Sequence, residues 1–322
     1  MHRRLLPVLA AAVALAPAAS AGSDGGRPVA LVTAETANEL LELTLGPHGG
    51  RVLHRLRLPH PQTVAATCRA ALAVDPPAGT VTLLALPTLR PLTVLRSFRS
   101  PQLAAFAGAG LAYVTDAGTG DLAVVDVARR TVVDRVFVGR GAHHLALSPT
   151  DGRLWVALGE DARTIVRLDV SSPRRPRVVG RFHPAVPAHD LAFAPGGRTV
   201  WVTSASAPVV SVYAASDGRL LRRIPAGRAP QHVVFDRGRA LITSGYGVSL
   251  ESVSLGTHRR LRLVRTPYGS FNLAADGPLV VTTSLLTGEV GEFRLGDLHR
   301  LWTRRVAPAA RAVAIAACAT RR

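Results

Sequence analysis

The sequence contains no lysine. All 39 basic side chains are arginines, and 21 aspartates and glutamates leave a formal net charge of +18. A basic surface can attract nucleic acid or other anionic polymers, but these arginines occur in every segment and lack interleaved aromatic residues. Because Arg, Ala, Gly, Pro and Val are abundant together, we interpret the arginines mainly as a product of GC-rich coding. Specific nucleic-acid binding is therefore not expected.

Aromatic residues are also scarce, at 5 % of the chain, whereas hydrophobic residues make up 48 % and the mean hydropathy is +0.22. Chains of this composition bury enough apolar surface to fold. The core must therefore be built mostly from Val, Leu and Ala, and disorder is not expected.

The sequence has one long apolar run, at its start. Residues 1–21 combine Arg3 and Arg4, an apolar stretch from Leu5 to Ala16, and the small residues Ala19-Ser20-Ala21. This order is typical of a secretory signal peptide. We expect residues 22–322 to form a single exported domain without a transmembrane segment, monomeric, and extracellular, periplasmic or associated with the cell wall.

Catalytic motifs are missing as well. There is no G-x-S-x-G, no H-E-x-x-H, no phosphate-binding glycine loop and no closely spaced cysteine pair. The sequence thus favours a function without catalysis.

What the chain does contain is a repeat. Short apolar segments recur seven times at intervals of 41, 41, 42, 46, 40 and 39 residues. A period of about 40 residues, with room for four short strands in each unit, predicts an all-β, seven-bladed β-propeller. The segments are Leu31-Val32-Thr33, Leu72-Ala73-Val74, Tyr113-Val114-Thr115, Trp155-Val156-Ala157, Trp201-Val202-Thr203, Leu241-Ile242-Thr243 and Val280-Val281-Thr282.

A second recurring position marks the start of the opening strand of each unit. It is occupied by Gln62, Gln102, His143, His189, Gln231, Phe271 and Arg311. The first unit lacks an opening strand, and the apolar segment at 310–316 has no unit of its own. We therefore expect the C-terminal strand to complete blade 1 and close the ring, which removes an exposed sheet edge.

The segment "AYVTDAGTGDLAVVDV" at 112–127 resembles the signature of the YVTN-repeat seven-bladed β-propellers, with Asp116 in the position of the family's asparagine. Trp155-Val156 and Trp201-Val202-Thr203 also fit the family pattern. The resemblance extends over most of 28–318 and is strongest in blades 3 to 6. It implies a propeller fold but no particular activity, because the motif is structural.

Histidines recur at the opening position of three successive blades. Inner strands line the channel of a propeller, so these side chains are expected to meet at one mouth. The candidate ligand-binding residues are His143, His144, His189, Asp190, Gln231, His232 and Arg311, of which His144, Asp190 and His232 would suit a divalent metal. The alternative is that histidine here is a repeat feature that hydrogen-bonds to neighbouring blade loops. Because a ligand site rarely needs one residue in consecutive repeats, the sequence favours that alternative, and no cofactor is assigned.

Three functions therefore remain in order. The first is an exported, non-catalytic propeller that binds a protein, polymer or small ligand through its loops or channel mouth. The second is a lactonase- or oxidoreductase-like propeller enzyme with a metal at the mouth. The third is electrostatic binding of nucleic acid or an anionic cell-wall polymer, which requires the arginines to cluster on one face.

The remaining expectations concern single residues. Asp126 and Asp169 are interpreted as turn formers, Trp155 and Trp201 as packing residues, and Trp302 as partly exposed on an outer strand. Cys68 and Cys318, the two cysteines of the chain, lie near the same end of neighbouring inner strands. In an exported protein they are expected to form a disulfide, although two buried free thiols remain the alternative.

Overall fold

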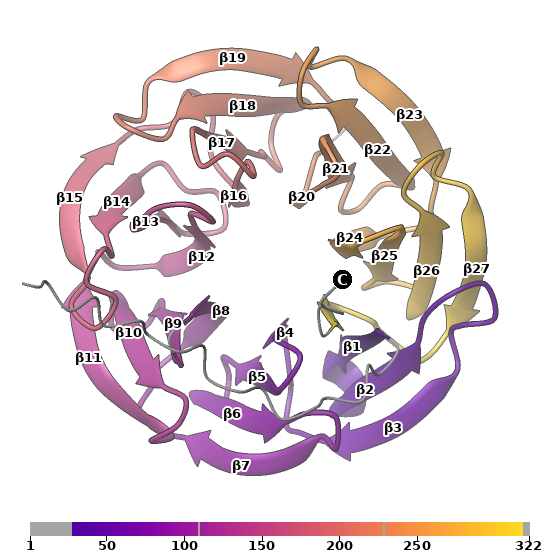
Figure 1. Cartoon of the computed structure of the whole chain (residues 1–322), viewed down its shortest axis with the longest axis horizontal. Coiled ribbons are helices and arrows are strands. Elements are labelled where there is room, and N and C mark those ends of the chain that lie inside the picture. The colour runs from indigo at the N-terminus through magenta and orange to yellow at the C-terminus, as the bar shows by residue number, and fades with distance from the viewer. Residues whose placement is uncertain (1–27, 109, 228, 318–322) are drawn as a thin grey trace, which may run out of the picture.

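The computed structural model describes residues 28–108, 110–227 and 229–317. In this part of the chain the strands form seven antiparallel sheets of four strands each, arranged as blades around a central channel (Figure 1). This confirms the predicted seven-bladed propeller. The proposed signal peptide and Cys318 lie outside the described residues, so the cleavage site and the disulfide stay predictions. No helix long and apolar enough to cross a membrane is found within these ranges.

Each blade has four strands, counted outward from the channel. The innermost are β28 (Val313–Ala316), β4 (Thr63–Ala66), β8 (Pro101–Gly108), β12 (Ala142–Leu147), β16 (Leu191–Phe193), β20 (Val233–Asp236) and β24 (Ser270–Asp276). The second are β1 (Val29–Ala34), β5 (Ala70–Asp75), β9 (Leu111–Asp116), β13 (Arg153–Leu158), β17 (Thr199–Val202), β21 (Arg239–Thr243) and β25 (Leu279–Ser284). The third are β2 (Glu39–Thr44), β6 (Thr80–Ala85), β10 (Asp121–Asp126), β14 (Ile165–Asp169), β18 (Val209–Ala214), β22 (Ser249–Ser254) and β26 (Glu289–Arg294). The outermost are β3 (Val52–Arg57), β7 (Arg90–Leu95), β11 (Thr131–Phe137), β15 (Arg177–Phe182), β19 (Leu220–Pro225), β23 (Arg260–Arg265) and β27 (Arg300–Arg305).

The second strands carry the core, because neighbouring blades cover both of their faces. Every residue of β5 and β9 is buried, and so is nearly all of β1. A strand buried on both faces reads as a continuous apolar run, which is why these segments gave the clearest repeat. The outer strands are largely exposed, as in β19 and β23.

The ring closes within blade 1, whose strand order is β28-β1-β2-β3 (Figure 1). Strand β28 pairs antiparallel with β1 from Val29↔Ala316 to Val32↔Val313. Val313 and Ala310 join Ala30, Val32 and Trp302 in one apolar cluster. The prediction that the C-terminal strand completes the first blade is confirmed.

A repeated hydrogen bond joins successive blades at the channel. A threonine at the end of the second strand donates its hydroxyl to the backbone carbonyl of the opening residue in the next blade. The pairs are Thr33 to Gln62 (3.1 Å), Thr115 to His143 (2.5 Å), Thr203 to Gln231 (2.6 Å), Thr243 to Phe271 (3.2 Å) and Thr283 to Arg311 (2.8 Å). Because the backbone of the opening residue makes this joint, its side chain is left to vary.

The tryptophans are all buried. Trp155 and Trp201 are 1 % exposed, as expected of packing residues. The expectation for Trp302 is wrong: the loop around Gly49 and Gly50 of blade 1 packs against its ring, and its indole N–H donates to the carbonyl of Gly46 (3.0 Å). Joining the last blade to the first covers this outer strand.

The two aspartates interpreted as turn formers have that role. Asp126 ends β10 and accepts from the backbone N–H of Arg129 (2.9 Å). Asp169 ends β14 and accepts from the N–H of Ser171 (2.8 Å).

Candidate functional site

One mouth of the central channel holds a cavity of about 120 Å³ that is lined from all seven blades. Five of the candidate residues line it: His143, His144, His189, His232 and Arg311. The other two lie behind this wall, since Asp190 contacts His232 and Gln231 contacts His189. The opening positions of the inner strands therefore meet at one place.

Three of the histidines form a compact cluster. His144 on β12, His189 just before β16 and His232 just before β20 are buried, and one ring nitrogen of each lies within 4.8 Å of the others. The metal set expected from the sequence was His144, Asp190 and His232. The structure brings His189 into the cluster, whereas Asp190 approaches from the far side of the His232 ring.

Each imidazole of the cluster has a polar partner at Nδ1. The Nδ1 of His189 lies 3.0 Å from the Glu160 carbonyl, and the Nδ1 of His232 lies 3.2 Å from an Asp190 carboxylate oxygen. Both partners only accept hydrogen bonds, so these rings carry their proton on Nδ1 and the lone pair on Nε2. The Nδ1 of His144 lies 2.9 Å from that of His143.

The Nε2 atoms differ in their surroundings. The Nε2 of His232 is buried and has no hydrogen-bond partner among the described residues. The Nε2 of His189 accepts from the side-chain amide of Gln231 (2.6 Å). Gly245 (φ +58°) makes room for that amide, because a Cβ at this position would overlap the Gln231 oxygen.

Burial keeps the cluster uncharged. It lowers the pKa of His143 and of His189 to about 4, and that of His144 well below its usual value. Neighbouring charges act in the same direction on His143 and His144, including the guanidinium of Arg311. Neutral imidazoles at neutral pH offer lone pairs, which is the form that binds metals.

The opposite wall of the cavity is built from blades 7 and 1. The guanidinium of Arg311 lies 5.3 Å from the ring centre of Phe271, which lies 5.4 Å from the ring of His232. Arg311 also pairs with Glu35 (2.9 Å), and Glu35 accepts from the amide of Gln62 (2.8 Å). The mouth thus has an imidazole side and a guanidinium side.

Sequence reasoning did not identify Glu160, Asn272 or Glu35. Glu160 follows β13, lines the cavity and places a carboxylate oxygen 3.8 Å from the Nε2 of His143. Asn272 follows an opening position by one residue, as His144 and His232 do, and this offset was the available signal. Glu35 and Glu160 follow second strands, where the sequence shows no recurrent pattern.

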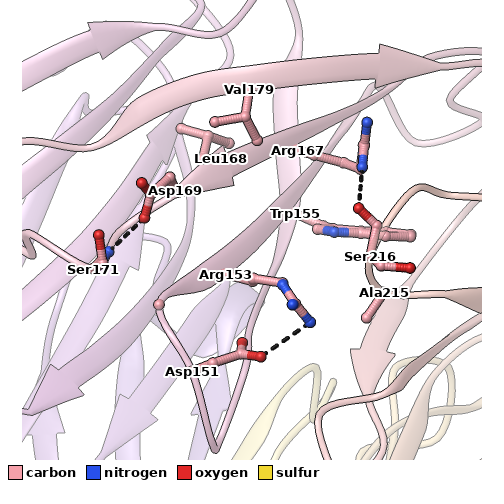
Figure 2. A pocket seen from close by; sticks show the side chains of 11 residues that line it. Asp151, Arg153, Trp155, Arg167, Leu168, Asp169, Ser171, Val179, Ala215 and Ser216 are labelled. Carbon is pink, nitrogen blue, oxygen red and sulfur yellow. Dashed lines mark hydrogen bonds and ion pairs between the residues drawn. The ribbon is translucent and has the colours of Figure 1, made fainter.

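A second cavity, of about 240 Å³, lies between blades 4 and 5 near Trp155 (Figure 2). Its polar groups already serve one another: Arg153 pairs with Asp151 (3.0 Å), and Arg167 donates to the carbonyl of Ser216 (2.6 Å). We therefore place the candidate site in the channel, where unused lone pairs converge.

Searches with protein-family models and among curated proteins find no match, so membership of the YVTN-repeat family stays a prediction. Solved structures do match. A protein of unknown function from Desulfotomaculum acetoxidans is 12 % identical with a TM-score of 0.77, covering 90 % of this chain and 99 % of that one. A candidate 6-phosphogluconolactonase from Bacteroides fragilis is 12 % identical with a TM-score of 0.75, covering 92 % and 99 %. The dihydro-heme d1 dehydrogenase NirN is 18 % identical with a TM-score of 0.65, covering 92 % and 67 %. At these identities the likeness is one of fold, and this chain is a seven-bladed β-propeller.

Proposed function

We propose that this protein is an exported binding protein that holds a divalent transition-metal ion at its channel mouth, through the Nε2 atoms of His144, His189 and His232. The observation that supports it is the convergence of three buried imidazoles, with ring nitrogens within 4.8 Å of one another. Partners at Nδ1 that fix ring orientation and leave Nε2 free are the usual surroundings of metal-binding histidines.

The donor set indicates which metals to expect. Imidazole nitrogen suits zinc, copper and nickel, whereas magnesium and calcium prefer oxygen ligands. With Zn–N bonds of about 2.1 Å, tetrahedral ligands lie about 3.4 Å apart. Small side-chain rotations therefore suffice to bring the cluster to bonding distance, at the cost of the hydrogen bond from Gln231 to His189.

The other two functions receive less support. A fourth coordination position left open by three histidines also occurs in metal-dependent hydrolases, but no feature of the cavity singles out a reaction. The electrostatic alternative required arginines on one face, and each of the seven outer strands carries at least one. Binding is therefore the function that we put forward.

Metal binding is tested on the purified mature chain after removal of metal with a chelator. Titration with Co²⁺ and Zn²⁺ by calorimetry should show one equivalent bound, and bound Co²⁺ should give the visible absorption of a low-coordinate site. His144→Ala and His232→Ala should each weaken Co²⁺ binding at least a hundredfold. His48→Ala, which removes an exposed histidine, should bind as the wild type does. If the wild type binds neither metal, or if His48→Ala weakens binding as much as His232→Ala does, the proposal is wrong.

A further inference from the structure

The wall that faces the histidines carries hydrogen-bond donors that the fold leaves unused. Arg311 spends one nitrogen on Glu35 and makes no other side-chain hydrogen bond with described residues. Since a guanidinium has five N–H donors, the rest remain available at the cavity. The side-chain amide of Asn272, which also lines the cavity, has no hydrogen bond within the described ranges.

Arg311 is held in place before any ligand arrives. Its ion pair with Glu35 (2.9 Å) and its position over the Phe271 ring (5.3 Å) fix the guanidinium from two sides. Glu35 is itself anchored by the amide of Gln62 (2.8 Å). A guanidinium oriented in this way loses little side-chain entropy on binding, and its planar fork matches a carboxylate.

The depth of the cavity limits what fits between the two walls. Below the polar side chains it is lined by Val64, Leu103, Ala104 and Val313. A volume of about 120 Å³ is well under that of pockets for drug-sized ligands, roughly 300 Å³ and more. Sugars and nucleotides are excluded by size, whereas an acid of a few carbon atoms fits.

We propose that the channel mouth binds a small chelating carboxylate, of the hydroxy-acid or dicarboxylate class, between the histidine-held metal and Arg311. One end of the molecule takes the open coordination position of the metal. The carboxylate at the other end accepts hydrogen bonds from Arg311 and from the amide of Asn272. This inference rests on the proposed function, because it needs the metal, and it adds the class of second ligand.

The test compares Co²⁺-loaded and metal-free mature protein with malonate and lactate as probes, and malonamide and lactamide as neutral controls. The acids should change the visible spectrum of bound Co²⁺ and bind with measurable heat, whereas the amides should do neither. Arg311→Gln should weaken malonate binding at least tenfold while Co²⁺ affinity stays within twofold of the wild type. Arg300→Gln, which removes an exposed outer-strand arginine, should leave both unchanged.

The outcomes separate this inference from the proposed function. Loss of malonate binding with Co²⁺ binding intact in Arg311→Gln supports the bridge. Bound Co²⁺ that responds to neither acid overturns the bridge and leaves the metal site standing. Equal malonate affinity in loaded and metal-free protein also overturns it. Should Arg311→Gln fail to fold, Asn272→Ala serves instead, with the same expected split and an expected threefold or greater loss.

Discussion

Glu292 on β26 is a carboxylate buried at the joint between the last blade and the first. Its side chain is fully buried, and its two oxygens accept from the backbone N–H of Gly46 (2.9 and 3.1 Å). Burial outweighs these hydrogen bonds and raises its pKa from the ordinary 4.5 to about 7. The folded protein therefore keeps this proton at pH values where the unfolded chain has released it.

The consequence is a stability that falls as the pH rises. Between pH 4.5 and 7 the native state binds more protons than the unfolded state, so the free energy of unfolding decreases with pH. The full loss is about 3 kcal/mol at most. Urea unfolding at pH 5 and pH 8 should show it in the wild type, and Glu292→Gln should largely abolish it.

The control for this prediction is Glu289→Gln, a substitution on the same strand at a carboxylate that accepts from Thr287 (2.7 Å). It should keep the wild-type pH dependence. An unchanged pH dependence in Glu292→Gln would refute the assignment to this residue.

Residue by residue, the sequence predicted the positions that repeat and missed those that do not. His144, His189 and His232 were found because the opening position recurs in every blade. Glu160 escaped because loops after second strands have no shared pattern. The replacement of Asp190 by His189 in the metal cluster depends on which way each side chain turns at the end of its strand, and strand spacing carries no information on that.

Among the elements, the second strands were predictable and the outer strands less so. A second strand is buried on both faces in every blade, so its composition is constrained in the same way seven times. An outer strand depends on its neighbours, and Trp302 on β27 is buried by the loop at Gly49 of blade 1. That contact joins residues about 250 positions apart, beyond the reach of local pattern.

Strand β28 is the element whose removal should cost most per residue. Truncation after Pro308 would expose the inner edge of β1 and withdraw Val313 and Ala310 from the shared core. Losing this packing should destabilise the protein by several kcal/mol and lower the melting temperature by roughly 10 °C. Differential scanning fluorimetry measures the shift. A control that removes residues 320–322 alone keeps β28 and should melt with the full-length chain, and equal melting of the larger truncation would contradict the structural role of the strand.

For the whole molecule, the period of about 40 residues predicted seven blades, and the missing opening strand predicted where the ring closes. Both follow from counting, because a closed ring must supply every blade with four strands. What the channel holds could not be predicted in the same way, since the cavity is made by one side chain from each blade and only the folded ring brings them together.

The pairing of β1 with β28 also determines how the ring responds to force. Val29 and Ala316 are register partners at one end of an antiparallel pair, so tension applied through the two ends of the chain loads a single rung of the ladder at a time. Such pairs open like a zip rather than by sliding. In an optical trap, pulling at both ends should peel β28 from the ring at low force before any other blade yields, and a first event at high force would show that the load is shared differently.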